Sequence, residues 1–295
     1  MRQSLIAFGD FHLTENKPIC RKEKDFIATQ QGKLKQIVDL AISTNSMLVC
    51  AGDLLDYWKH DGYQLVNMVN GVLAGWTCCG VAGNHELPHH SMDQYYRSPL
   101  KAITDFKLLQ PDSSPAGFSF GVPVIPTKAE VCVQHRMIYL SDPIHGYEGN
   151  KYDVRHEYER DVYKNYRVVI TGDNHKPFVY RKDDDHVWVN CGCVYRTSVT
   201  EKDYEPSCWQ IILDDNTVEI IQHKLAVVTD DVDRTEMYLD RVKDSFVSEF
   251  ATEVKQQVTQ KQDYAGIVGE LCDNQPPELT KLVYANIDEA KKEIK

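Results

Sequence analysis

Residues 47–56, MLVCAGDLLD, contain the pattern on which the predicted fold depends. The apolar run MLVCA has the length and composition of a buried strand, and Gly52 marks its end. Two acids, Asp53 and Asp56, follow directly. Because ligands bind at the carboxyl ends of the strands in open α/β sheets, acids placed here are candidates for a binding site.

Strand-like and helix-like segments alternate around this stretch. SLIAF at 4–8 and TCCGVAG at 77–83 are predicted strands, and YQLVNMVNGVLAG at 63–75 is a predicted helix. The segment KLKQIVDLAIS at 33–43 predicts another helix, with one apolar face made of Leu34, Ile37, Val38, Ala41 and Ile42. This βαβαβ order predicts an α/β fold with a mostly parallel sheet covered by helices.

From residue 118 the pattern changes to short β segments. They are FSFGVPVIP (118–126), EVCVQH (130–135), YRVVITG (166–172), FVYRK (178–182), HVWVNCG (186–192), CWQIILDD (208–215) and TVEIIQHK (217–224). The turns KDDDH and LDDNT predict two hairpins. Residues 234–260 and 277–295 read as helices, so we expect a small helical extension at 230–295 after a catalytic domain at 1–229.

Length and composition indicate a globular protein. With 295 residues, 42% of them hydrophobic, the chain can bury a large core. Its apolar stretches fall well short of the ~20 residues of a membrane span, so no membrane contact is expected. The N-terminal MRQSLIAFGD enters a strand at once, which argues against a signal peptide and predicts a cytoplasmic protein, in the host cytoplasm if a phage encodes it. Nine cysteines without a CxxC pair indicate reduced, buried thiols rather than a thiolate metal site.

Polar side chains that can bind metal follow several of the predicted strands. They are Asp10, His12, Asp53, Asp56, Asn84, His85, His135, Asp173 and His175. The word GDxH occurs twice, as GDFH at 9–12 and GDNH at 172–175. Residues i and i+2 of an extended segment point the same way, so each word can present two ligands to one centre. Taken singly, such acids are also ordinary turn residues.

Carboxylate, amide oxygen and imidazole without thiolate suit Mn, Fe or Zn and fit Ca poorly. This many candidate ligands exceed what one zinc ion takes, and a central carboxylate such as Asp53 can bridge two ions. Two ions clamp the oxygens of an in-line phosphoryl displacement and lower the pKa of a shared water. The pattern therefore favours phosphoester hydrolysis.

Other residues compete for roles at this site. His89, His90, His145 and His156 are alternatives to His135, which we prefer because an alternating apolar run delivers it to a strand end. Trp58, Tyr95, Tyr96 and Tyr195 either stack on a nucleobase or are packing residues. Three arginines are candidates for binding a phosphate oxygen, namely Arg97, Arg136 and Arg196.

The ordered words GDFH, GDLLD, GNHE, VQH and GDNH resemble the motifs of the calcineurin-like metallophosphoesterases. That resemblance implies a four-layer α/β/β/α sandwich of two facing sheets flanked by helices. It implies a first divalent metal ion held by Asp10, His12, Asp53 and His175. It implies a second held by Asp53, Asn84, His135 and Asp173. His85 would face the substrate phosphate as acid or charge stabiliser, oriented by Asp56.

One residue departs from the family pattern, which usually ends in G-H-x-H. Asp173 stands where the first histidine is expected. A carboxylate there favours harder ions, so we expect Mn, with Fe, Zn or Mg as alternatives, or a weak second metal site.

The segment VNCGCVYRTSVTEKDYEPSCWQIIL, residues 189–213, resembles the region after the last metal motif of SbcD-type exonuclease subunits and their phage-encoded relatives. This resemblance implies DNA as substrate, a substrate-binding Arg196, and an ATPase partner docked on the C-terminal helices. A homodimer is left open.

Three functions are consistent with these patterns. The first is a DNA exonuclease or endonuclease subunit. The second is a small-molecule phosphoesterase acting on nucleotides, cyclic nucleotides or phosphoprotein, which the net charge of −11 favours because nucleic-acid binders usually carry a basic face. The third is an interaction module that has lost metal through Asp173.

Overall fold

The computed structural model describes residues 2–59, 63–105, 109–110, 118–120, 129–140, 153–198, 201, 203–226, 280–281 and 284. The chain separates into two compact units, residues 1–232 and 233–295. The predicted helices at 234–260 and 277–295 lie outside the described residues apart from Thr280, Lys281 and Tyr284, which are helical. The predicted boundary after residue 229 stays a prediction.

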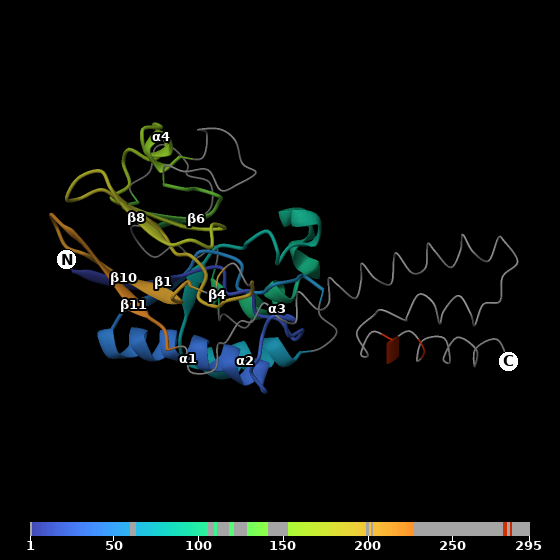
Figure 1. Cartoon of the computed structure of the whole chain (residues 1–295). Helices are drawn as coiled ribbons and strands as arrows, with labels where there is room; N and C mark the ends of the chain where they lie inside the picture. Colours follow the sequence, from blue (N-terminus) through green and yellow to red (C-terminus); the bar gives the residue numbers. More distant parts are fainter. Residues whose placement is uncertain are drawn as a thin grey trace, which may run out of the picture. The chain divides into compact units, whose positions relative to one another are not determined.

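The first sheet contains the predicted parallel strands and an antiparallel hairpin at one edge (Figure 1). In sheet order its strands are β11 (Val218–Lys224), β10 (Ser207–Leu213), β1 (Gln3–Phe8), β2 (Met47–Cys50), β3 (Cys78–Gly80) and β4 (Leu109–Gln110). Strands β1 to β4 pair in parallel, while β10 pairs antiparallel with both β1 and β11. The β10–β11 hairpin turns at LDDNT, as its turn residues predict.

The second sheet collects the short strands of the second half. In order these are β5 (Phe118–Phe120), β6 (Val131–His135), β7 (Val168–Gly172), β9 (Val187–Asn190) and β8 (Phe178–Arg181). Neighbours from β5 to β9 are parallel, and β8 pairs antiparallel with β9 across the predicted KDDDH turn. The part of FSFGVPVIP beyond residue 120 lies outside the described residues.

Helices flank the two sheets. Helices α1 (Phe26–Thr44), α2 (Gln64–Leu73) and α3 (Pro99–Asp105) lie on the outer side of the first sheet, and α4 (Val154–Tyr158) lies beyond the second (Figure 1). The 3-10 segments η1 (Pro88–His90) and η2 (Met92–Arg97) lie between β3 and α3 in the chain. Helix α1 begins where the Asp25 side chain accepts from the backbone of Ala28, and it ends at Asn45, which is left-handed.

Three apolar clusters separate the layers. One packs α1, α2 and α3 against the first sheet, a second fills the space between the sheets, and a third lies between the second sheet and α4. This is the predicted four-layer α/β/β/α sandwich. The predicted apolar face of α1 is correct for four residues but wrong for Ile42, which is 49% exposed.

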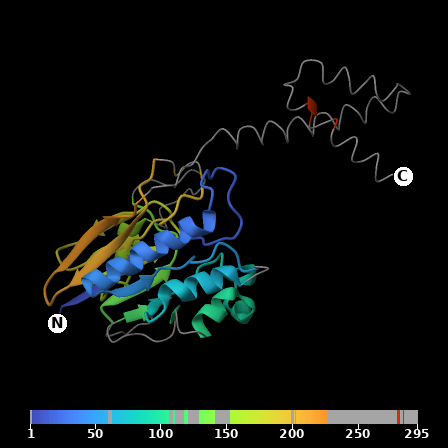
Figure 2. The ribbon, with the colours of Figure 1, turned by 90° about the horizontal axis from the view of Figure 1, so that it is seen from below.

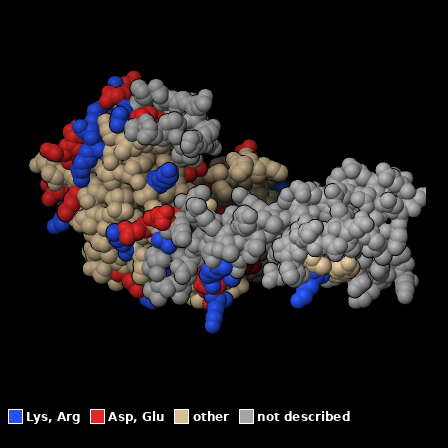
Figure 3. Space-filling view, in the orientation of Figure 1, with Lys and Arg blue, Asp and Glu red and all other residues tan. Residues whose placement is uncertain are grey.

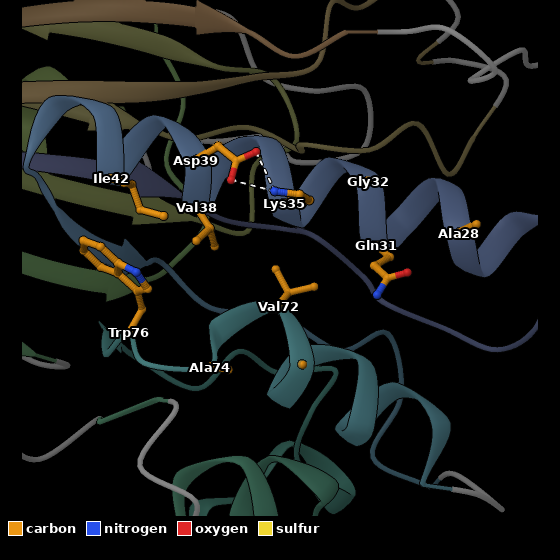
Figure 4. Close-up of a pocket in the computed structure, with 11 residues that line it drawn as sticks. Ala28, Gln31, Gly32, Lys35, Val38, Asp39, Ile42, Val72, Ala74 and Trp76 are labelled. Atoms are coloured by element: carbon orange, nitrogen blue, oxygen red, sulfur yellow. Dashed lines mark hydrogen bonds and ion pairs between the residues drawn. The ribbon is translucent and has the colours of Figure 1, made fainter.

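Helices α1 and α2 run side by side across the molecule (Figure 2). Between them lies a groove of about 500 Å³, with Ile42, Val38 and Trp76 toward one end and Ala28 and Gln31 toward the other (Figure 4). The residues that line this groove include none of the candidate metal ligands.

The cysteines and the helices can be compared with what the sequence predicts. The eight described cysteines are all free and buried, as predicted, and Cys272 lies outside the described residues. Among the described residues, no helix is both long enough and apolar enough to cross a membrane.

Candidate metal centre

Strand ends from both sheets bring the predicted ligands together. The register pairs Phe8 with Cys50 and Cys50 with Gly80, so β1, β2 and β3 end at one level. In the second sheet His135 at the end of β6 pairs with Gly172 at the end of β7. Two hydrogen bonds join the sheets here: Asp173 N–H donates to Asp10 Oδ1 at 2.8 Å, and His135 Nδ1 donates to the carbonyl of Ala51 at 2.9 Å.

Three glycines let the backbone approach the ligands closely. A Cβ on Gly52 would meet the His135 ring, and one on Gly172 would meet the carbonyl of Ala51. A Cβ on Gly83 would collide with the Asp53 carboxylate. The glycine directly before Asp53, Asn84 and Asp173 therefore has a steric reason.

Four candidate ligands have left-handed backbones although none is glycine. Their φ angles are 47° at Asp10, 52° at His12, 49° at Asp53 and 78° at Asp173. Such conformations cost about 1 to 3 kcal/mol each and cluster at functional sites. Both GDxH words contain this strain, because Asp10, His12 and Asp173 belong to them.

The first ligand group consists of Asp10, His12 and His175, whose ligand atoms lie within 4.8 Å of one another. The Nε2 atoms of the two histidines are 3.1 Å apart. His175 Nδ1 donates to Glu201 Oε1 at 2.7 Å, which leaves Nε2 of a neutral ring as a lone-pair donor. The Nδ1 atom of His12 lies 3.2 Å from Asp56 Oδ1. At this distance either His12 donates Nε2–H to His175 Nε2, or both nitrogens turn their lone pairs to a metal ion.

The second ligand group consists of Asp10, Asp53 and His135. His135 Nε2 lies 3.2 Å from Asp53 Oδ2 and 2.8 Å from Asn84 Oδ1. Asp173 Oδ1 is farther away, 3.8 Å from His135 Nε2, and Asp173 belongs to neither group.

Two carboxylates lie between the groups, whereas the sequence predicted this position for Asp53 alone. Asp10 belongs to both groups. Asp53 Oδ2 lies 3.9 Å from His12 Nε2 and 3.2 Å from His135 Nε2.

Burial and mutual attraction shape the charges. Burial raises the pKa of Asp10, and the charges of the surrounding histidines oppose this shift without cancelling it. Burial also acts to raise the pKa of Asp53, but His135 outweighs it and the pKa lies below its usual value. His135 itself has a pKa raised to about 10, because Asp53 overcomes the effect of burial. A divalent cation would compete with these protons for the same atoms.

The donor set fits a divalent cation. Asp10 is fully buried, and its Oδ2 atom has no hydrogen-bond partner among the described residues. Buried carboxylates require a compensating charge, and oxygen with imidazole nitrogen is a donor set for Mn, Fe or Zn. The ring Nδ1 atoms of His135 and His175 are fixed by a carbonyl and a carboxylate, as is usual for metal-binding histidines.

His85 and Asp56 lie beside the first group. His85 N–H donates to Asp53 Oδ1 at 3.0 Å, and His85 Nδ1 donates to the carbonyl of Asp56 at 3.0 Å. The Asp56 carboxylate lies 3.6 Å from the same Nδ1 and raises the pKa of His85 to about 9. The Asp56 carboxylate thus favours the protonated ring, and the His85 side chain, which is 44% exposed, is accessible to a substrate.

Two glutamates at the centre received no role from the sequence. Glu86 is fully buried and accepts hydrogen bonds from Leu55 N–H and Gly83 N–H, which joins the loops carrying Asp53 and Asn84. Burial raises the pKa of Glu86 to about 7. Glu201 accepts from His175 and, with Cys193, forms a further group of close ligand atoms. Their only sequence signals were the motif GNHE and the acidic stretch after Arg196.

Several other candidates have hydrogen-bond or ion-pair partners within the protein. Arg196 Nε donates to the carbonyl of Tyr204, and Arg136 forms an ion pair with Glu157. Tyr195 is fully buried, so the stacking role considered for it is wrong. His90 donates to the carbonyl of Asn84, while His145 lies outside the described residues.

The buried Lys33 side chain allows a prediction about pH. Lys33 is 2% exposed, and burial, with the charges of Arg196 and Arg21, lowers its pKa to about 8. The unfolded chain binds this proton more tightly, so stability rises with pH between about 8 and 10.5. We expect Lys33→Met to raise the free energy of unfolding by about 1 to 3 kcal/mol below pH 8, and to remove part of that slope. Urea unfolding of wild type and Lys33→Met at pH 7 and pH 9.5 measures the free energy of unfolding and its change with pH. The same change with pH in both proteins would contradict the prediction.

No family model and no curated protein matches this sequence. Among solved structures, the chain is similar to vacuolar protein sorting 29 from Cryptosporidium parvum, with 12% identity, a TM-score of 0.35 and coverage of 77% of this chain and 99% of that one. It is also similar to a zinc complex of vacuolar protein sorting 29 from Entamoeba histolytica, with 14% identity, a TM-score of 0.32 and coverage of 75% of this chain and 99% of that one. A third similar structure is a Staphylococcus aureus protein named as a 5′-nucleotidase, with 12% identity, a TM-score of 0.44 and coverage of 83% of this chain and 59% of that one. Likenesses this weak leave the ligand and the reaction of this chain to be inferred from its own residues.

Proposed function

We propose that this protein is a metal-dependent phosphoesterase that holds two divalent ions, with Mn favoured. The observation that supports this most is the meeting of two ligand groups at the strand ends, with Asp10 in both. Asp10, His12 and His175 would hold one ion, and His135 and Asn84 the other, with Asp173 close to the second. Asp53, whose Oδ2 lies near both His12 and His135, would be shared by the two ions. Bound there, the ions would supply charge stabilisation for the phosphoryl group and activate water.

His85 would donate a proton to the leaving oxygen or stabilise charge on the phosphate. Its ring is exposed, Asp56 fixes Nδ1 as the protonated nitrogen, and Nε2 remains to face the substrate. The Asp53 side chain accepts from the His85 backbone and so places this residue beside the ligands.

We expect His85→Ala to lower kcat by about 10² or more while leaving metal content unchanged, because general acid–base groups contribute that much. Metal analysis and steady-state kinetics of the same preparation measure both. His186→Ala is the matched control, because His186 lies on the β8–β9 hairpin and contacts Asp183. Wild-type turnover in His85→Ala would remove His85 from the mechanism.

For the substrate we propose DNA, which the protein would cleave as an exonuclease or endonuclease, on the resemblance of residues 189–213. The aromatic rings beside Asp56 are compatible with binding a base: Tyr57 is 50% exposed, and Trp58 lies 5.7 Å from Tyr57 and 6.3 Å from His89 between ring centroids. An ATPase partner docked on residues 230–295 is part of this proposal.

A nucleotide phosphoesterase is the second candidate, and surface charge favours it. The net charge is −11, and on the face in Figure 3 lysines and arginines are interspersed with acids. Binding to a DNA backbone usually uses a basic surface.

The test is hydrolysis by the purified protein with Mn²⁺, using labelled single- and double-stranded DNA beside bis-p-nitrophenyl phosphate and p-nitrophenyl phosphate. Shortening of DNA that EDTA abolishes, and that weakens steeply with salt, supports the nuclease. Hydrolysis of the small esters alone supports the second candidate. No hydrolysis, with one ion or none bound, supports an interaction module.

A further inference from the structure

Glu201 contacts the candidate metal centre through a single histidine. Its Oε1 atom accepts from His175 Nδ1 at 2.7 Å, and its side chain is 12% exposed. On the opposite side of the same ring, His175 Nε2 faces His12 Nε2 at 3.1 Å. The imidazole therefore lies between the carboxylate and the first ligand group.

The other oxygen of Glu201 is held by the backbone. Glu201 Oε2 accepts from Thr197 N–H at 2.7 Å and from Ser198 N–H at 3.0 Å. The Glu201 N–H donates back to the carbonyl of Ser198 at 3.1 Å. A carboxylate held by two backbone donors on one oxygen leaves the other oxygen in a defined position.

The segment that carries these donors is anchored in the interior. The carbonyl of Arg196 accepts from Arg21 at 2.8 Å, and Arg21 is buried and paired with Glu23. Tyr195, just before it, is fully buried and shares hydrogen bonds with both Arg21 and Glu23. This network restrains the backbone on which Glu201 depends.

The histidines of the centre differ in what fixes their Nδ1 atoms. His135 donates to the carbonyl of Ala51, and His85 donates to the carbonyl of Asp56 with the Asp56 carboxylate 3.6 Å away. For His175 the partner is a carboxylate, which fixes the ring and also increases the basicity of Nε2. A single side chain therefore controls this ligand, and substitution can test it without changing a proposed ligand.

We propose that Glu201 is a positioning residue of the metal centre, which sets the tautomer and orientation of His175 and so the affinity for the ion in the first ligand group. This inference rests on the proposed function. It predicts that loss of Glu201 weakens the binding of one ion and leaves the binding of the other unchanged. The second group of Asp10, Asp53 and His135 has no contact with Glu201 in the described hydrogen bonds.

The experiment is calorimetric titration with Mn²⁺ of wild type, Glu201→Ala, Glu201→Gln and the control Glu205→Gln. Glu205 lies on the same segment, is 62% exposed and pairs with Lys224 at the surface. We expect Glu201→Ala to weaken one of two binding steps by about 10 to 100-fold. Glu201→Gln keeps a neutral acceptor for Nδ1–H and should lose less Mn²⁺ affinity than Glu201→Ala. Glu205→Gln should bind Mn²⁺ with wild-type affinity.

A second readout separates positioning from loss of structure. The long-range ¹H–¹⁵N spectrum of the imidazoles without metal should show His175 as the Nδ1–H form in wild type and lose that preference in Glu201→Ala. Unchanged circular dichroism and an unchanged His135 signal would show that the fold is retained.

The outcomes distinguish this inference from the proposed function. Two binding steps of wild-type affinity in Glu201→Ala overturn the role of Glu201 and leave the phosphoesterase proposal intact. Wild type that binds no Mn²⁺ overturns both. Equal weakening in Glu205→Gln would also overturn the specific role, because that residue has no contact with His175 among the described hydrogen bonds.

Discussion

Asp53→Asn is expected to lower turnover by about 10³ or more and to weaken the binding of both metal ions, because this carboxylate lies between the two ligand groups. Its Oδ2 is near His12 and His135, and its Oδ1 accepts from His85 N–H. A thousandfold loss corresponds to about 4 kcal/mol of transition-state stabilisation, in the range that metal ions contribute. An asparagine NH₂ placed toward His135 Nε2 would also replace attraction by repulsion when that ring is protonated.

Metal content by mass spectrometry and hydrolysis of bis-p-nitrophenyl phosphate measure this effect. Asp39→Asn is the matched control, because Asp39 is 53% exposed and pairs with Lys35 on α1. Two tightly bound ions in Asp53→Asn would show that Asp53 does not lie between them when they are bound. Full activity with no metal in either protein would contradict the proposed function itself.

Gly83→Ala is expected to disrupt the centre without replacing any ligand. A Cβ at Gly83 would collide with both Asp53 Oδ1 and the Asp53 backbone nitrogen, and backbone atoms cannot rotate away. The same loop donates Gly83 N–H to the buried Glu86. We expect about 1 to 3 kcal/mol of lost stability, as for other overpacked sites, and loss of metal binding.

Gly71→Ala provides the opposite control. Gly71 is in α2, and a Cβ there meets nothing within 4 Å, so alanine should stabilise the helix by about 0.5 to 1 kcal/mol. Urea unfolding of both variants measures whether the free energy of unfolding falls in Gly83→Ala and rises in Gly71→Ala. Wild-type stability and metal content in Gly83→Ala would show that the loop carrying Asn84 shifts without cost.

The fold was predictable where the sequence has local periodicity and turn chemistry. The βαβαβ order and both hairpins follow from local patterns and are present. The family resemblance, not the periodicity, supplied the second facing sheet. Ile42 shows the limit of periodicity: its place at the C-terminal end of α1 leaves it 49% exposed beside the α2 groove.

The candidate site was predictable as a set of residues but not as a geometry. Asp10, His12, Asn84 and His135 follow strand ends in the sequence, and the structure brings them together. Their distances depend on contacts across the two sheets, such as Asp173 N–H to Asp10 and His135 to Ala51. The roles of metal ligands stay predictions until an ion is measured.

By itself, the sequence determined which residue types end each strand and where glycine removes a steric obstacle, since both are local properties. Only the tertiary structure decided that Asp10 lies in both ligand groups, that Asp173 stands outside them, and that Glu201 reaches His175. These are contacts between segments far apart in the chain. They depend on the register of strands in two sheets and on their packing, which no local pattern encodes.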